Sequence, residues 1–201
     1  MNVRTSSTIE SSNQPTARWH EQYDDITMIV AQCRNTSSRG RLMDESYQSK
    51  VTELINKSEV TAVVNSYFRA LDEKAFDPGR FGTIFTAEAA VTRPNGASLT
   101  GPEEISASHQ RSFTRFEGSQ HLLAVPDIAI DGGTATVRAN LVAMHMWQGS
   151  HTDANKADNF FIAGGVIEAK LTKTDGQWKI SQLSNTVVWR AGGFKNMAQT
   201  S

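Results

Sequence analysis

Four strand-like runs make up most of the second half of the chain, and they constrain the fold more than any other feature. The runs cover residues 119–130, 134–147, 160–173 and 177–190. They are separated by the turn DGG, by a polar loop rich in Gly, Asp and Asn, and by the turn TDGQ. Runs joined in this way are typical of strands that pair antiparallel. The sequence therefore predicts a long antiparallel meander, to which a shorter strand near 88–93 is added.

The residues before this meander have a helical pattern. From about residue 47, apolar side chains recur at intervals of three and four, the spacing of one face of a helix. Asp77 followed by Pro78 favours the start of a second, short helix. Thr100 and Glu103 have the spacing of a capping box, which predicts a third helix directly after it. Helices followed by an antiparallel meander indicate an α+β fold, with the helices packed on one face of a curved sheet.

The first 46 residues differ from the rest of the chain in composition. They are rich in Ser, Thr, Asn, Gln and Arg, and their one apolar patch covers residues 26–33. A segment this polar buries too little apolar surface to order itself. We therefore expect a flexible N-terminal arm with one short helix over 1–46, a single α+β domain over 47–195, and a tail over 196–201.

Charge and hydropathy argue against several classes of partner. The chain has 20 Lys and Arg residues against 21 Asp and Glu residues, without a basic cluster of the kind that binds nucleic acid. No apolar run is long enough to cross a bilayer, and the N-terminus does not resemble a secretory signal. The single cysteine, Cys33, cannot form an internal disulfide. These features together favour a cytoplasmic location.

Two of the five histidines, His121 and His145, lie near the two ends of the first hairpin. The strand that carries His145 alternates regularly, so every second residue shares the face of its imidazole. The other members of this face are Ala135, Val137, Ala139, Leu141, Ala143 and Trp147. Because all of these side chains are apolar, we expect this face to turn toward the interior.

The partner strand of this hairpin changes parity at residues 126–127, where its apolar positions move to the other face. A one-residue bulge at Pro126–Asp127 restores a continuous apolar face, and proline within a strand is typical of bulges and edges. The resulting register places Val125 on the inner face and His121 opposite Ala143. His145 is then the diagonal neighbour of His121, about 7–8 Å away. We therefore expect both imidazoles to face one cavity.

A carboxylate for these histidines is found at the end of the long predicted helix. Asp72 follows Phe68 by four residues, at the edge of the apolar stripe. The helix dipole disfavours a negative charge there by a few tenths to about 1 kcal/mol, which suggests a nearby partner. A His–Asp pair fixes the imidazole tautomer and stabilises imidazolium, as proton transfer near neutral pH requires. The candidate catalytic residues are Asp72, His121 and His145.

Simpler interpretations of these residues remain open. His121 can be a core histidine, His145 can serve only to shape the pocket, and Asp72 can cap the segment that follows it. The group His145, His151 and Asp153 lacks a known metal-ligand spacing, so we expect neither a metal site nor a cofactor. Tyr67 lies in the middle of the helical stripe and is typical of a core residue. His20 and His109 carry no functional signal.

Several motifs of the chain resemble those of the SnoaL-like proteins, a branch of the nuclear-transport-factor-2-like superfamily. They are YFRALDEKAFD, FTAEAAV, GPEEI, SQHLL and TDGQWKISQLSNTVVWRAG. The resemblance covers about residues 50–194. It implies a cone-shaped fold, in which a curved antiparallel or mixed sheet carries three helices on its concave side and encloses a pocket.

Within that superfamily the site is similar to that of the scytalone dehydratase family. The resemblance makes His121 the catalytic histidine, Asp72 the aspartate that orients it, and His145 the second pocket histidine. The pattern departs where that family has two tyrosines, at Leu71 and Arg93, and where it has a pocket asparagine, near Ile167. Scytalone is therefore not the expected substrate. The expected substrate-binding residues are Tyr67, Leu71, Arg93, Leu123, Leu141, Trp147 and Ile167.

These observations favour a cofactor-independent lyase or isomerase that acts on a small apolar or aromatic metabolite. In this hypothesis His121 is the base and then the acid, Asp72 orients it, and His145 donates a hydrogen bond. Dehydration fits best. Cyclisation or isomerisation in specialised metabolism, such as that of polyketides, would use the same catalytic residues. The alternative is a ligand-binding or structural subunit without chemistry. An epoxide hydrolase, which would need an Asp–Arg–Asp arrangement, ranks third.

The resemblance also implies a homodimer or homotrimer that packs the outer face of its sheet against a neighbour. The alternate face of the 134–147 strand carries Val142, Met144 and Met146. These residues, with parts of 160–190, are the expected interface.

Overall fold

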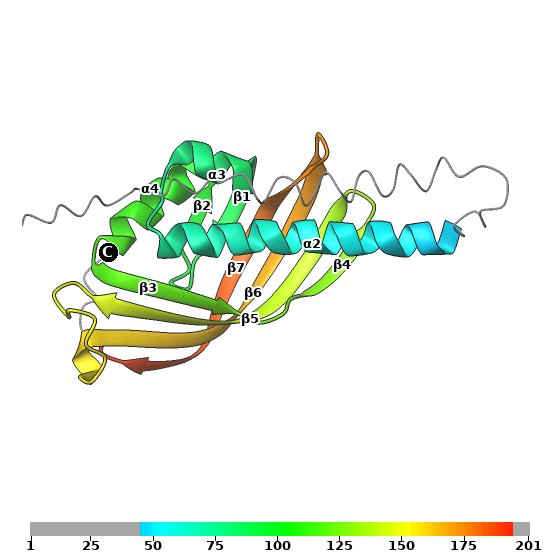
Figure 1. Ribbon diagram of the computed structural model, residues 1–201. Helices are drawn as coiled ribbons and strands as arrows, with labels where there is room; N and C mark the ends of the chain where they lie inside the picture. The colour runs from blue at the N-terminus through cyan, green and yellow to red at the C-terminus, as the bar shows by residue number, and fades with distance from the viewer. Residues whose placement is uncertain (1–44, 195–201) are drawn as a thin grey trace, which may run out of the picture. The chain divides into compact units, whose positions relative to one another are not determined.

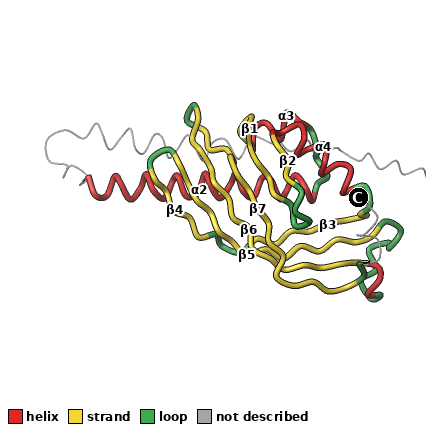
Figure 2. Tube along the Cα trace, turned by 180° about the vertical axis from the view of Figure 1, so that it is seen from behind, coloured by secondary structure: helices red, strands yellow, loops and turns green. Residues whose placement is uncertain are grey.

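The computed structural model describes residues 45–194, so the predictions for an arm and a tail lie outside the described residues. Its helices are α2 (Glu45–Asp72), α3 (Pro78–Ile84), α4 (Gly101–Phe113) and the short 3₁₀ turn η2 (Ala157–Asn159). None of the described helices is long and apolar enough to cross a membrane. In Figures 1 and 2, α2 runs across one face of the sheet from both viewpoints.

The strands form one curved, seven-stranded sheet in the order β2-β1-β7-β6-β5-β3, with β4 also paired to β5. All pairings are antiparallel except that of β1 with β7. The predicted α+β architecture, with three helices and a curved mixed sheet, is confirmed. The strands are β1 (Phe85–Thr92), β2 (Ser98–Thr100), β3 (Phe116–Leu123), β4 (Asp127–Asp131), β5 (Thr134–Trp147), β6 (Phe160–Thr174) and β7 (Gln177–Gly192).

The first hairpin has the predicted register. His121 pairs with Ala143, while Leu123 pairs with Leu141 on the near side of the interruption between β3 and β4. Beyond it, Asp127 pairs with Arg138. The three residues 124–126 therefore lie opposite only two residues of β5. The third is the extra residue of the predicted bulge.

Val125 was expected on the inner face of this hairpin, and that expectation is wrong. Its side chain is 95% exposed. The backbone N–H of Ala124 still donates to the carbonyl oxygen of Asn140, at 2.9 Å. The ladder to β5 resumes only at Asp127, so the bulge is concentrated at Val125 and Pro126 and turns the valine out to solvent.

The concave face of the sheet carries the core. Every second residue of β5, from Ala135 to Trp147, is buried as predicted. Residues of β6 and β7 such as Ile167 and Ile180 are also fully buried. Helix α2 covers this face with Val60, Val64, Tyr67, Phe68 and Leu71. Burial of these side chains is the main force that holds the helix against the sheet.

The predicted helix starts are correct for one helix and shifted for another. The Asp77 carboxylate accepts a hydrogen bond from the backbone N–H of Arg80, at 2.8 Å, and caps α3 as predicted. At α4 the predicted capping box with Glu103 is wrong, because Glu104 accepts from the backbone N–H of Thr100 instead. Gly101 has a φ of 76°, so regular helical conformation begins one residue later and Glu104 takes the third position.

Candidate active site

The carboxylate of Asp72 holds His121 by two hydrogen bonds. One oxygen accepts from the His121 backbone N–H at 3.0 Å, and the other contacts its ring Nδ1 at 2.5 Å. The amine of Lys74 donates to the carbonyl oxygens of Phe116 and Glu117, and so ties the end of α2 to the start of β3. The helix end that carries Asp72 is thereby fixed beside the strand that carries His121.

This double contact determines which ring nitrogen of His121 is available. An ionised carboxylate can only accept hydrogen bonds, so Nδ1 of His121 carries a proton. In the neutral imidazole Nε2 then has a free lone pair, and it has no hydrogen-bond partner among residues 45–194. The His121 side chain is 6% exposed and that of Asp72 26% exposed. The pair is therefore largely, but not completely, shielded from water.

His145 lies beside this pair, as the hairpin register requires. The centroids of the His121 and His145 rings are 5.3 Å apart, and the ring planes are nearly perpendicular. Nδ1 of His145 forms a hydrogen bond of 2.9 Å with the hydroxyl of Ser119, its neighbour on β3. Burial, and secondarily the nearby His121, lowers the pKa of His145 to about 3. His145 is therefore neutral at pH 7, and of the two histidines only His121 has a carboxylate partner.

Aromatic rings surround the three candidate residues. The Phe68 ring lies 5.4 Å from that of His121, and the Phe161 ring stacks on His145 at 4.5 Å. Phe113, the last residue of α4, contacts both imidazoles, at 6.3 Å from His121 and 5.7 Å from His145. These rings exclude water from the site and strengthen the electrostatic interactions inside it.

His109, on α4, is a buried residue that the sequence analysis missed. It is 4% exposed, and its Nε2 lies 3.0 Å from the hydroxyl of Tyr67. Burial is the main cause that lowers the pKa of His109 to about 3. Its spacing of four residues from both Ile105 and Phe113, which are also buried, is the helical signal that could have found it.

Two of the expected substrate-binding residues belong to this second polar group. Tyr67 is buried in the core, and burial raises the pKa of its hydroxyl, which is therefore protonated at neutral pH. The guanidinium of Arg93 donates to the hydroxyls of Ser108 and Ser112 on α4, and burial lowers its pKa. It is close enough to act electrostatically on both Tyr67 and His109.

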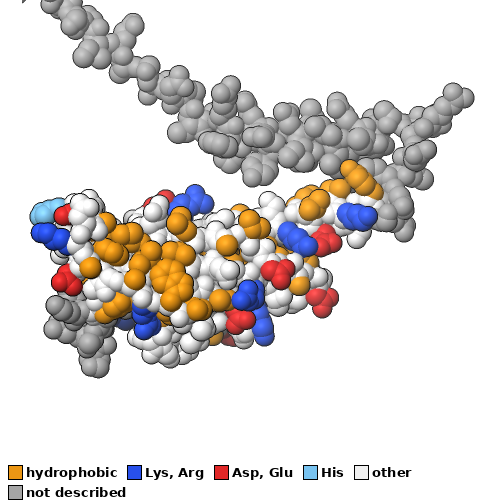
Figure 3. Space-filling view, turned by 90° about the horizontal axis from the view of Figure 1, so that it is seen from below, with side chains coloured by type: hydrophobic (Ala, Val, Ile, Leu, Met, Phe, Trp, Pro, Cys, Tyr) orange, Lys and Arg blue, Asp and Glu red, His pale blue; other side chains and the backbone are white. Residues whose placement is uncertain are grey.

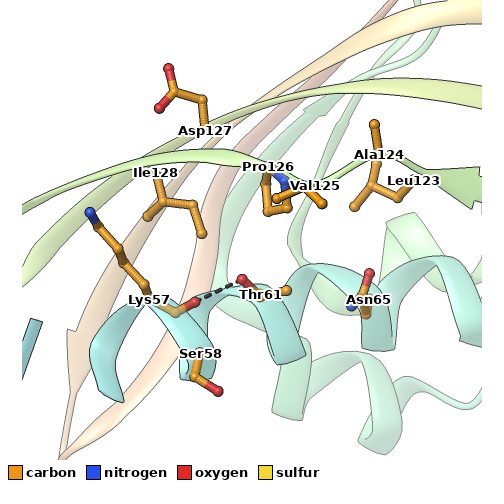
Figure 4. A pocket seen from close by; sticks show the side chains of 10 residues that line it. All are labelled: Lys57, Ser58, Thr61, Asn65, Leu123, Ala124, Val125, Pro126, Asp127 and Ile128. Carbon is orange, nitrogen blue, oxygen red and sulfur yellow. Dashed lines mark hydrogen bonds between the residues drawn. The ribbon is translucent and has the colours of Figure 1, made fainter. Parts of the chain in front are cut away.

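The other expected substrate-binding residues divide between the core and a groove. Leu71, Leu141, Trp147 and Ile167 are buried in the core cluster. Leu123 is half-buried and lines an open groove of about 520 Å³ between α2 and the β3–β4 bulge. Figure 4 shows this groove, with Ile128 pointing toward α2 and Asp127 pointing away from it.

The groove lies along the same face of α2 as the histidine–aspartate pair. Its helical wall is formed by Lys57, Ser58, Thr61 and Asn65. Phe68 and Asp72 continue this series at intervals of three and four residues, which keeps them on one helix face. On the strand side, Leu123 is the next residue on the face of His121. The groove therefore leads along α2 toward the dyad.

Asn185 is a second polar residue that the sequence analysis missed. It lies on β7 opposite Ile167, the position near which the related dehydratases were expected to have an asparagine. Its side-chain oxygen is buried without a hydrogen-bond partner among the described residues. Within residues 45–194, no group of three or more His, Cys, Asp and Glu side chains is placed to hold a metal ion.

Comparisons with known proteins agree with this fold. The chain is similar to the Kfla4162 protein from Kribbella flavida, with 18% identity and a TM-score of 0.62 over 69% of this chain and 94% of that one. It is also similar to a hexachlorocyclohexane dehydrochlorinase, LinA type 2, with 13% identity and a TM-score of 0.60 over 71% and 92% of the two chains. A candidate scytalone dehydratase from Novosphingobium aromaticivorans matches with 19% identity and a TM-score of 0.59, over 76% and 99%.

At these identities the likeness is one of fold. A search of curated protein sequences finds no match. The model of one protein family, described as the SnoaL-like domain, matches residues 52–184, which is more than half of the chain. The chain therefore belongs to the SnoaL-like family.

Proposed function

We propose that the protein is a cofactor-independent lyase in which His121 transfers protons and Asp72 orients it. The observation that carries the proposal is the double hydrogen bond from Asp72 to the backbone N–H and ring Nδ1 of His121. It supports a single tautomer and a single ring orientation, with Nε2 available as a base. The dehydratase and dehydrochlorinase among the structural neighbours are lyases, in agreement with this reaction class.

The favoured reaction is the dehydration of a β-hydroxy carbonyl compound. Nε2 of His121 removes the proton from the carbon between the carbonyl and the carbinol. The electron pair of that C–H bond forms the new C=C bond while the C–O bond to the β-hydroxyl breaks. The departing hydroxyl takes the proton back from Nε2 and leaves as water, so the imidazole ends the cycle neutral. Asp72 stabilises the imidazolium that exists between the two proton transfers.

His145 has a different role in this proposal. Its low pKa keeps it neutral, so it does not compete with His121 for the proton. A neutral imidazole held by Ser119 supplies a hydrogen bond to the substrate or to its leaving group. Isomerisation or ring closure would use the same acid and base.

The substrate we propose is a small apolar or aromatic metabolite. The dyad is bordered by phenylalanine rings. The strand side of the adjacent groove is apolar except for Asp127, and its helical side carries Lys57, Ser58, Thr61 and Asn65. Such a lining fits a largely apolar body with a few hydroxyl or carbonyl groups, as in intermediates of polyketide type.

The test is a screen of β-hydroxy ketones with wild type, His121→Gln and Asp72→Asn. We expect elimination of water, and exchange of the α-hydrogen with D₂O, in the wild type. Both variants should lose both activities, while Ser66→Ala, on the exposed side of α2, serves as the matched control. Exchange that persists in His121→Gln would refute the assignment of the base.

The alternative is a ligand-binding subunit without chemistry. One observation favours it, because the Phe113 ring packs against both His121 and His145 and is itself buried in the core. In that case small ligands would bind equally well to wild type and Asp72→Asn, and no substrate would exchange hydrogen.

We also propose that the protein forms a homodimer or homotrimer through the outer face of its sheet. Leu122, Val188 and Trp189 are 60%, 69% and 47% exposed, and Figure 3 shows hydrophobic side chains gathered on one face of the molecule. Exposed apolar patches of this kind mark interaction sites. Light scattering should give two or three chain masses for the wild type and one for Trp189→Glu, and an unchanged mass in the variant would contradict the proposal.

A further inference from the structure

Arg93 is a half-buried cation without a carboxylate partner among residues 45–194. It begins the turn between β1 and β2, and its backbone N–H closes that turn by donating to the carbonyl oxygen of Ala97 at 2.9 Å. Figures 1 and 2 show this hairpin beside α4. Nη1 of Arg93 donates to the hydroxyls of Ser108, at 3.0 Å, and Ser112, at 2.8 Å. These two contacts hold the guanidinium in one orientation against the helix.

Half of this guanidinium is left without a partner. Its other two nitrogens, Nε and Nη2, carry three N–H groups. Neither nitrogen forms a hydrogen bond with the described residues, and neither is one of the buried polar atoms that lack a partner there. Both are therefore in reach of solvent. Together they form the fork with which an arginine donates to two oxygens of a carboxylate or phosphate.

Two further arginines lie on the side of α4 that carries these serines. Arg111 and Arg115 follow Ser108 and Ser112 by three residues each, which keeps all four on one helix face. Nε of Arg115 donates to the carbonyl oxygen of Ser112 at 3.2 Å, so this serine contacts two guanidinium groups. Burial is the main cause that lowers the pKa of Arg93, and the charges of Arg115 and Arg111 lower it further.

The end of α4 explains this cluster only in part. The carbonyl end of a helix attracts cations, but it carries about half a negative charge, which is less than the charge of Arg93 and Arg111 together. Within residues 45–194 no carboxylate acts on Arg93, and the Tyr67 hydroxyl, which does, is neutral at neutral pH because burial raises its pKa. A half-buried charge without a counter-charge is costly. The cluster therefore calls for an anion that the described residues do not supply.

We propose that Arg93 anchors an anion-binding site between the β1–β2 turn and α4, which takes the carboxylate or phosphate group of a small ligand. In this site Nε and Nη2 of Arg93 each donate to one oxygen of the anion. Ser108 and Ser112 hold the guanidinium in place, and the exposed Arg111 adds positive charge at the rim.

The site is separate from the dyad, although α4 borders both. Phe113, which contacts His121, and His109, which contacts Phe113, each follow one of the two serines by one residue. One residue turns a helix by about 100°, so the serines and these two rings lie on different faces of α4. The inference therefore goes beyond the proposed function and does not depend on it.

The test is a titration of the wild type with sodium acetate and with sodium phosphate at constant ionic strength, followed by ¹⁵N NMR of the arginine side chains. We expect the Nε resonance of Arg93 to shift and to saturate with at least one of the two anions. The resonance of Arg138, an exposed arginine of β5, should not saturate, and neutral acetamide should shift neither. Saturation with phosphate alone would assign the site to phosphate esters, whereas saturation with acetate would assign it to carboxylates.

Variants test which side chain is responsible. Arg93→Gln removes the fork and should weaken binding of the anion by about tenfold or more, the worth of a hydrogen bond to a charged group. Arg93→Lys keeps the charge without the fork, so its affinity should lie between the two. Ser112→Ala removes one of the contacts that orient Arg93 and should weaken binding without a change in charge. Arg138→Gln is the matched control and should bind as the wild type does.

Equal affinity of wild type and Arg93→Gln would overturn the inference. So would an Arg93 resonance that moves in proportion to the concentration of either anion without saturating, since water alone would then be the partner of the fork. If Arg93→Gln does not fold, the titration of the wild type and that of Ser112→Ala decide. None of these measurements involves proton transfer by His121, so failure of the anion site leaves the proposed function as it stands.

Discussion

The two buried neutral histidines should make the stability of the protein fall steeply in mild acid. The pKa values of His109 and His145 are both lowered by burial, from 6.5 to about 3. In the unfolded chain both side chains return to ordinary values and bind protons at higher pH. Between about pH 6.5 and pH 3 the unfolded state therefore holds more protons than the folded one, and stability decreases as the pH falls.

The size of the effect follows from these values. At about pH 5 an unfolded histidine with a pKa of 6.5 is almost fully protonated, whereas the folded one is neutral. Each histidine therefore lowers the free energy of unfolding at this pH by about 2 kcal/mol relative to about pH 7.5, and the two together lower it by about 4 kcal/mol. Because His109 is 4% exposed and His145 is 7% exposed, solvent screening does not reduce it much. A loss of this size is a large part of the stability of an ordinary domain, which is about 5–15 kcal/mol.

Urea unfolding, followed by tryptophan fluorescence at a series of pH values, measures this slope. His109→Gln and His145→Gln cannot titrate, so each should lose about 2 kcal/mol less than the wild type between about pH 7.5 and pH 5. The comparison cancels the carboxylates, which titrate alike in all three proteins. A variant whose loss equals that of the wild type would show that the corresponding histidine is not held neutral by the fold.

Three further predictions concern single contacts. Asp72→Asn should lower the turnover of any substrate found by about 10²–10⁴-fold without unfolding the protein, because His121 loses the anion that orients it. Near-normal turnover would show that the dyad is not part of the mechanism. Asp77→Ala should lower the free energy of unfolding in urea by about 1 kcal/mol, since the Asp77 carboxylate caps α3. Thr100→Ala should lower it by less, because the Thr100 side chain makes no capping bond, and equal losses would contradict this. Gly164→Ala should cost about 1–3 kcal/mol, since its new methyl group would lie 2.1 Å from the Trp189 ring, and an unchanged midpoint would mean that the ring moves freely.

The part of the fold that could be predicted is the part in which neighbours in sequence decide the structure. The alternation of β5 is unbroken, so its inner face follows from the two-residue period of a strand. Pro126 marked the bulge, because proline cannot take part in a regular ladder. The convergence of His121 and His145 followed from these two facts. The outward turn of Val125 could not be predicted in this way. A bulge sets the register of the residues on either side of it, but it does not set the direction in which its own side chains point.

The part that could not be predicted depends on side chains that meet from distant elements. His109 escaped notice because Ser106 and Ser108, also buried, blur the apolar face of α4. Phe113 was not recognised as a neighbour of three imidazoles, since these lie on α4, β3 and β5. Leu71, Leu141 and Ile167 belong to the core cluster, and their expected role in substrate binding stays a prediction.

The position of β7 has a consequence for how the chain reaches its fold. It is the last strand along the described residues, yet it lies between β1 and β6 in the sheet. During synthesis, one edge of β1 stays unpaired until about 95 further residues have been made, from Phe85 to its partner Ile180. Such long-range pairing slows folding and leaves strand edges open to other chains in the meantime. We therefore expect the step that joins the two parts of the sheet to follow the synthesis of β7, and truncation within β7 to produce aggregation and not a smaller folded domain.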